Sequence, residues 1–177
     1  MPAIVEATVE EYLAAGQNGQ TTTEQGRALE DLICYVFGLV PGVEITHRNE
    51  LNAFETEEID VALWNNGAAD GFGFLPNIVL IECKNWSSRV GSNEVNWFDT
   101  KLRNRGLTFG ILVSPLGITG QAADLTAAHL VVANALREGR RLLIIRTEEL
   151  RTIGDTVALI KLIKLRLCDL AVKGTVG

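Results

Sequence analysis

Apolar positions along the chain repeat with two periods, and together they predict an α/β fold. Short alternating or continuous apolar runs predict strands at 43–49, 57–65, 78–86, 108–115 and 140–147. Apolar residues at helical spacing predict helices at 4–15, 21–38, 92–106, 118–139 and 154–172. Three consecutive strands followed by alternating helices and strands are typical of a central mixed β-sheet with helices on both faces.

The last predicted helix is apolar around most of its circumference. Its leucine and isoleucine residues cover more than the one face that a helix on a domain surface needs. The excess is either buried within the fold or covered by a partner. A two-fold contact is the commonest way to bury such a face, so we expect a homodimer or a subunit of a larger complex, formed through residues 155–172 or 92–104.

Length and composition describe an ordinary globular chain. Its 177 residues are 47% hydrophobic and 21% charged, which suits a single domain with a full core. We expect residues 1–20 to form an N-terminal extension or short helix and residues 21–177 to form the domain. The sequence has no apolar run near the roughly 18 residues that cross a bilayer and no basic secretory signal.

Cysteine and histidine are too few and too scattered for a zinc site. Cys34, Cys83 and Cys168 lie far apart, with no C-x-x-C pair among them. An odd number of cysteines in apolar segments is typical of buried free thiols in a reducing compartment, so we expect a cytoplasmic protein.

Charge is distributed unevenly along the chain. The formal net charge of −6 at first disfavours a nucleic-acid partner. Residues 1–60 hold 2 basic and 12 acidic residues, 2 − 12 = −10, whereas residues 61–177 hold 14 and 10, 14 − 10 = +4. This asymmetry suits a one-sided binding face, and it equally suits a solvated acidic N-terminal part.

The strand at 78–86 carries two charged residues in an otherwise apolar run. Side chains alternate across a strand, so Glu82 and Lys84 point to the same face. If the strand that carries Asp60 pairs with this one, a second carboxylate lies beside Glu82. Neighbouring carboxylates repel each other unless a cation lies between them, and a hard divalent cation suits oxygen ligands. The alternative is a solvent-exposed ion pair at the end of a strand.

These residues resemble the D-x(n)-E-x-K core of the PD-(D/E)XK nuclease superfamily. A helix carrying Glu30, a strand carrying Asp60 and a strand carrying Glu82 and Lys84 follow one another at spacings of 30, 22 and 2 residues. The chain is most similar to the Mrr-type restriction endonuclease family, over about residues 21–153. Ile59 stands where many members have proline, and the glutamine of the RecB-type branch is missing.

The resemblance implies a restriction-endonuclease-like fold and a Mg²⁺- or Mn²⁺-dependent endonuclease that hydrolyses DNA, in prokaryotic restriction or anti-phage defence. It implies that Asp60, Glu82 and the carbonyl of Cys83 bind the metal and that Lys84 acts on the attacking water. Glu30 would contact the metal through water or support a second ion. The alternative for Glu30 is a solvated helix face.

Polar and basic residues that follow the strand at 78–86 are candidates for nucleic-acid contacts. Some lie in the loop that leaves the site, and others are expected on the open face of the helix at 92–106, where they could meet phosphates. The candidates are Asn85, Trp86, Ser88, Arg89, Lys101, Arg103 and Arg105.

Two other functions remain open. A nuclease-like fold could serve as a catalytically silent DNA-binding or assembly subunit, although the intact Asp60, Glu82 and Lys84 argue against this. The same chemistry could also act on a DNA structure such as a junction, although the low positive charge counts against that substrate.

Overall fold

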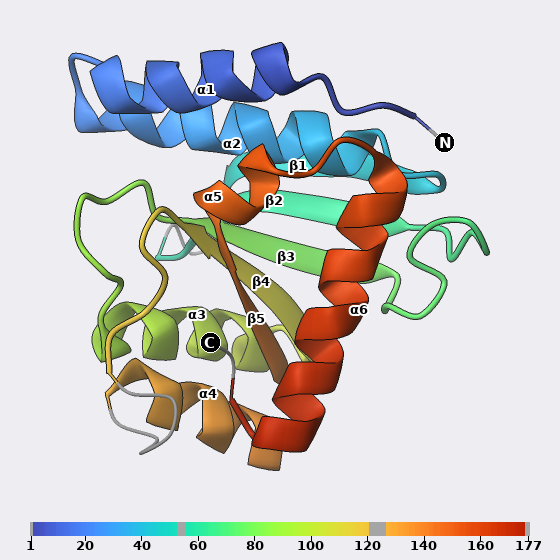
Figure 1. Ribbon diagram of the computed structural model, residues 1–177. Coiled ribbons are helices and arrows are strands. Elements are labelled where there is room, and N and C mark those ends of the chain that lie inside the picture. Colours follow the sequence, from blue (N-terminus) through green and yellow to red (C-terminus); the bar gives the residue numbers. More distant parts are fainter. Residues whose placement is uncertain (1, 53–55, 121–126, 176–177) are drawn as a thin grey trace.

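The computed structural model describes residues 2–52, 56–120 and 127–175, and its centre is a five-stranded sheet (Figure 1). The strand order is β1-β2-β3-β4-β5. The first two pairings are antiparallel and the last two are parallel, so the sheet is mixed as predicted. The strands are β1 Val43–Leu51, β2 Glu58–Asn65, β3 Ile78–Cys83, β4 Phe109–Ser114 and β5 Arg141–Arg146.

Helices flank this sheet, which confirms the predicted α/β architecture. Helix α2 contacts β1, β2 and β3, α3 and α4 pack together against β4 and β5, and α6 runs along β5. Helix α1 lies on α2 and also contacts α5. The helices are α1 Glu6–Asn18, α2 Thr22–Gly38, α3 Ser92–Asn104, α4 Ala128–Arg137, α5 Thr147–Arg151 and α6 Thr156–Lys173.

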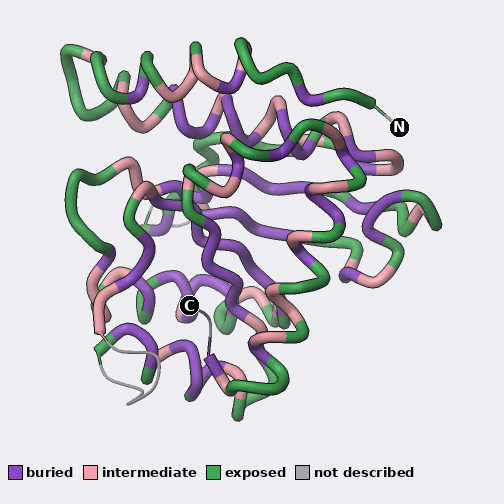
Figure 2. Tube along the Cα trace, viewed as in Figure 1, coloured by how far each residue is buried: buried purple, intermediate pink, exposed green. Residues whose placement is uncertain are grey.

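The core follows the strands at the middle of the sheet. Every residue of β4 is buried, and so is every residue of β3 except Ile78 (Figure 2). The covered strands β3 and β4 are almost entirely apolar, whereas the edge strand β1 is mostly exposed. Glu82 is therefore a charged residue in the most deeply buried part of the sheet.

The helix predicted at 21–38 is α2, and Thr21 caps it because Thr21 and Glu24 form a reciprocal capping box. One other predicted helix start is wrong. The helix expected at 118–139 begins at Ala128, because Ile118 pairs with Val90 in extended conformation. Residues 121–126 of that prediction lie outside the described residues.

Helix α6 buries one apolar face within the fold. Leu159, Ile160, Ile163 and Leu170 are buried. Other apolar positions remain exposed, namely Val157, Leu165 and Val172. No helix among the described residues is long and apolar enough to cross a membrane.

Helix α3 lies very close to β4 because residue 110 is glycine. A Cβ atom on Gly110 would lie 2.7 Å from Phe98 Cζ and 2.8 Å from Leu102 Cδ1. Residue 110 is the register partner of Leu80, and Glu82 is two residues further along β3. Because side chains alternate along a strand, Glu82 points to the face that α3 covers.

We expect Gly110→Ala to destabilise the fold, because its methyl group would push α3 away from the sheet. The cost should be about 1–3 kcal/mol, the usual range for overpacking a core. Gly26→Ala, in α2, is the control, since nothing lies within 4 Å of its added Cβ. It should instead stabilise the helix by about 0.5–1 kcal/mol. Urea denaturation measures both changes, and an unchanged Gly110→Ala variant would contradict the close packing of α3.

Candidate active site

Pairing between β2 and β3 brings two acidic residues together. Val61 is paired with Ile81, so the next step of this antiparallel ladder places Asp60 across from Glu82. Asp60 Oδ2 accepts a 2.7 Å hydrogen bond from the backbone N–H of Cys83. The two carboxylates therefore lie on adjacent strands, as the sequence predicts.

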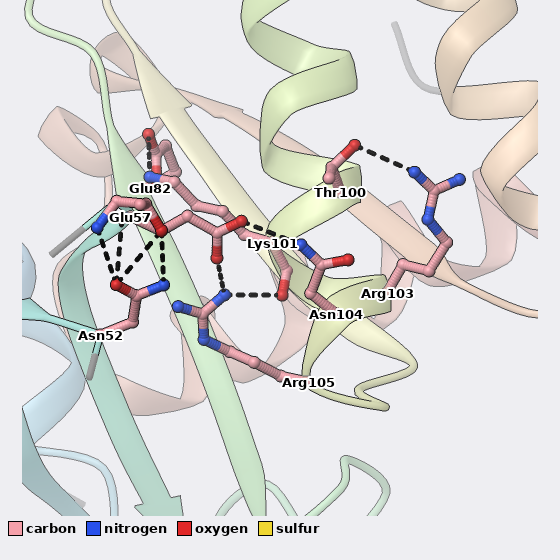
Figure 3. A network of polar contacts seen from close by, with 9 residues as sticks. Asn52, Glu57, Glu82, Thr100, Lys101, Arg103, Asn104 and Arg105 are labelled. Carbon is pink, nitrogen blue, oxygen red and sulfur yellow. Dashed lines mark hydrogen bonds and ion pairs between the residues drawn. The ribbon is translucent and has the colours of Figure 1, made fainter. Parts of the chain in front are cut away.

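Glu82 is buried and is held by two lysines. Lys84 Nζ lies 2.7 Å from Glu82 Oε1, so the two side chains share a face. Lys101 Nζ, from α3, donates to Glu82 Oε1 at 3.0 Å and to Oε2 at 2.7 Å (Figure 3). The side chain of Lys101 is only 5% exposed, whereas that of Lys84 is 24% exposed. Lys84 is thus the lysine that a substrate can reach.

Burial and mutual repulsion dominate the electrostatics of the two carboxylates. Burial, together with the charge of Glu82, raises the pKa of Asp60 to about 7. Burial opposes the charge on Lys84, but Glu82 and Asp60 nevertheless raise the pKa of Lys84 above its usual value. Near neutral pH, the Asp60 carboxyl group can therefore lose its proton when a metal cation binds.

Glu30 lies on α2, near enough to the Cys83 thiol for its charge to act on it. Glu30 is buried rather than solvated. Asn49 Nδ2 donates to Glu30 Oε2 at 2.7 Å, and Arg48 lies 3.5 Å from the same oxygen.

Burial and the charges of Asp60 and Glu30 raise the pKa of the Cys83 thiol well above its usual value. That thiol is therefore protonated, which leaves the backbone carbonyl as the oxygen donor that Cys83 can offer.

Comparison with known families agrees with this geometry. The Mrr catalytic-domain model, described as a restriction endonuclease, matches residues 24–142, two thirds of the chain. The chain belongs to this restriction endonuclease family. The matched segment includes most of α2 and all of β1 to β4, α3 and α4, and hence both carboxylates and both lysines. No match to a curated protein was found.

Nucleases of this family generally depend on a divalent metal, and the residues present fit such a cation. Mg²⁺ typically binds through one or two carboxylates and completes its shell with waters and substrate phosphate. Asp60 and Glu82 can supply these carboxylates. The raised pKa of Asp60 reflects burial and repulsion from Glu82, and a bound cation would relieve that repulsion. Among the described residues, no group of three or more His, Cys, Asp or Glu side chains is arranged to hold a metal.

The structure corrects one predicted DNA contact in this member of the restriction endonuclease family. Lys101 was expected on the open face of α3, but it is buried against Glu82. Periodicity could have indicated this, because Lys101 follows the buried Phe98 by three residues on the same helix. Arg105 is partly buried and paired with Glu57, whereas Arg103 is exposed.

Loop residues after β3 divide into an internal brace and an exposed group. Asn85 Nδ2 donates to the carbonyls of Gly16 at 3.0 Å and Gln25 at 2.8 Å, so it fastens the loop to α1 and α2. The exposed group consists of Trp86, Ser87, Ser88 and Arg89.

We expect Asp60→Asn to stabilise the metal-free protein at pH 8. The pKa of Asp60 is about 7 in the folded state against 3.8 for an ordinary aspartate, so the folded state loses stability as pH rises through this window. Removing the charge should add about 1–3 kcal/mol at pH 8, and the gain should vanish near pH 4. Denaturation in EDTA across this range measures the effect.

Asp70→Asn, which alters an exposed carboxylate in the turn before β3, is the control. It should show no such pH-dependent gain. An Asp60→Asn variant no more stable than the parent protein at pH 8 would contradict the repulsion between Asp60 and Glu82.

Proposed function

We propose that the chain is a divalent-cation-dependent endonuclease that hydrolyses DNA, acting in prokaryotic restriction or anti-phage defence. The observation that carries this proposal is the meeting of Asp60, Glu82 and Lys84 where β2 begins and β3 ends. Membership of the restriction endonuclease family supports hydrolysis of phosphodiesters and DNA as the substrate.

Each residue of the site has a distinct task in this proposal. Asp60 and Glu82 hold Mg²⁺ or Mn²⁺, with the Cys83 carbonyl as a further donor. The bound cation supplies positive charge for the scissile phosphate and a more acidic water. Lys84, the more accessible lysine, orients the attacking water and stabilises the negative charge of the transition state. Glu30 supports the site from α2 through water.

A hollow surface lined by the loop that follows Lys84 offers a path for the DNA strand. One hollow of about 520 Å³ is lined by Asn85, Trp86 and Leu116, among others. A second hollow of about 210 Å³ shares Leu116 with the first, and Arg89 and Arg146 also line it. These residues follow the carboxyl ends of β3, β4 and β5, where ligands commonly bind in α/β sheets.

Charge supports the same path. Arg89 is exposed, and the side chain of Arg146 is 57% exposed although it lies 3.7 Å from Glu149. Both guanidinium groups can therefore reach phosphates, which provide most of the affinity of proteins for DNA. Trp86, which is 40% exposed, can stack on a base.

We expect Lys84→Ala to reduce plasmid cleavage by at least about 10²-fold, because it removes charge stabilisation from the transition state. Mn²⁺ binding should persist, since an ammonium group is not a ligand. Glu82→Ala should weaken Mn²⁺ binding as well, because it removes an oxygen donor. Cleavage of plasmid and single-stranded DNA with Mg²⁺, Mn²⁺ or EDTA, together with titration calorimetry, measures these effects.

Equal loss of Mn²⁺ affinity in both variants would contradict these roles. Complete absence of cleavage by the parent protein, with DNA binding retained, would instead favour a silent DNA-binding subunit. Assembly into a homodimer or larger complex stays a prediction of the sequence, and the exposed apolar residues of α6 are its candidate surface.

We expect Arg89→Gln and Arg146→Gln each to weaken DNA binding about 3- to 10-fold near 0.1 M salt. Each should also lower the slope of log affinity against log salt by about one, because each removes one phosphate contact. Fluorescence anisotropy in the Lys84→Ala background, where cleavage is suppressed, measures both quantities. Arg137→Gln, at the exposed end of α4, is the control and should leave binding unchanged.

A further inference from the structure

Lys101 places a second ammonium group on the carboxylate that is expected to bind the metal. It donates to both oxygens of Glu82, at 3.0 and 2.7 Å, and Lys84 Nζ lies 2.7 Å from Oε1. Lys101 is almost completely buried, so water contributes little to solvating either partner. A buried carboxylate and ammonium each need the other, because an unpaired buried charge costs several kcal/mol.

The end of α3 is fastened so that Lys101 stays in this position. Arg105 Nη1 donates to the carbonyl of Lys101 at 3.0 Å and also pairs with Glu57 (Figure 3). Asn104 Nδ2 donates to Glu57 Oε1 at 2.9 Å. The hydrogen bond from Arg105 holds the pKa of Glu57 below its usual value, so Glu57 is a firm anionic anchor. Because Glu57 immediately precedes β2, these contacts join α3 to the strand that carries Asp60.

Lys101 changes the charge that an arriving cation meets. Asp60 and Glu82 supply two negative charges when both are ionised, and Lys84 and Lys101 supply two positive charges. The charge of Glu30 is met separately by Arg48. A divalent cation alone therefore enters a set of groups with no net charge, and it must also compete with Lys101 for Glu82. The scissile phosphate brings a further negative charge.

We infer that Lys101 is a resident counter-ion that makes binding of the divalent cation depend on the presence of DNA. This inference rests on the proposed function. Before DNA arrives, Lys101 holds the Glu82 carboxylate in place through both of its oxygens, and it keeps cation affinity low. When the phosphate enters, its charge favours the cation, and cation and DNA strengthen each other's binding by the same factor. Lys101 thus acts on the reaction through Glu82, as a positioning residue.

Titration calorimetry with Mn²⁺ tests the inference without any need for turnover. For the parent protein, Mn²⁺ affinity should rise about 10-fold when phosphorothioate DNA is added, since this DNA keeps its charge but resists cleavage. Lys101→Met should bind Mn²⁺ at least about 10-fold more tightly than the parent without DNA, because a competing positive charge is gone. The further gain on adding DNA should shrink in this variant.

Arg103→Met is the matched control, since it removes a positive charge from an exposed position on the same helix. It should leave Mn²⁺ affinity unchanged. Thermal melting adds a second measurement, because Lys101→Met leaves Glu82 with one partner. That variant should melt lower than the parent in EDTA and gain more from Mn²⁺. Lys101→Gln, which is neutral but can still donate to Glu82, replaces it if the methionine variant does not fold.

Three results would separate the possibilities. Tighter Mn²⁺ binding by the folded Lys101 variants supports the inference. Unchanged or weaker Mn²⁺ binding by those variants, with a parent protein that binds Mn²⁺ and cleaves DNA, overturns it and leaves the proposed function intact. A parent protein that binds no Mn²⁺ with or without DNA, and cleaves nothing, overturns the proposed function itself.

Discussion

The buried charge of Glu82 is the constraint on which the arrangement of this site depends. A carboxylate in the middle of a covered sheet is stable only when strong donors surround it. Here the donors are two lysines, one from the end of its own strand and one from α3. The second lysine reaches the carboxylate only because α3 packs closely on β4, and that packing depends on the missing side chain of Gly110.

Stability and chemistry pull in opposite directions at this site. Asp60 adds a second buried carboxylate whose charged form is disfavoured by burial and by Glu82. A fold selected for stability alone would place an amide or an apolar residue there. The strain has a use in the proposed reaction, because a cation bound between the two carboxylates would relieve their mutual repulsion.

The strands, the helix and the loop around Asp60 and Glu82 have different roles. Strands β2 and β3 set the spacing of the two carboxylates through their ladder. Helix α3 supplies Lys101 and is tied to the start of β2 through Glu57. The loop after β3 leads outward from Lys84 to exposed residues, so catalysis and DNA contact can adjoin without sharing side chains.

The sequence by itself determined the strands, most of the helices and the candidate chemistry. Periods of two and of about 3.6 residues indicated the mixed sheet, because burial on one face leaves a regular pattern in the chain. Glu82 and Lys84 were recognisable because charged residues are rare in an apolar strand. Asp60 and Glu30 followed from a resemblance in the order and spacing of residues, and the family match supports that resemblance.

Only the tertiary structure decided how these residues meet. The start of α4 depends on Ile118 pairing with Val90, a contact between distant segments. Lys101 looked like a solvated helix residue because local sequence does not reveal that a buried carboxylate lies opposite it. Its role depends on the register of β3 against β4, on the packing of α3, and on Gly110, which lets α3 approach β4 closely. Contacts between such distant segments exist only in the folded chain.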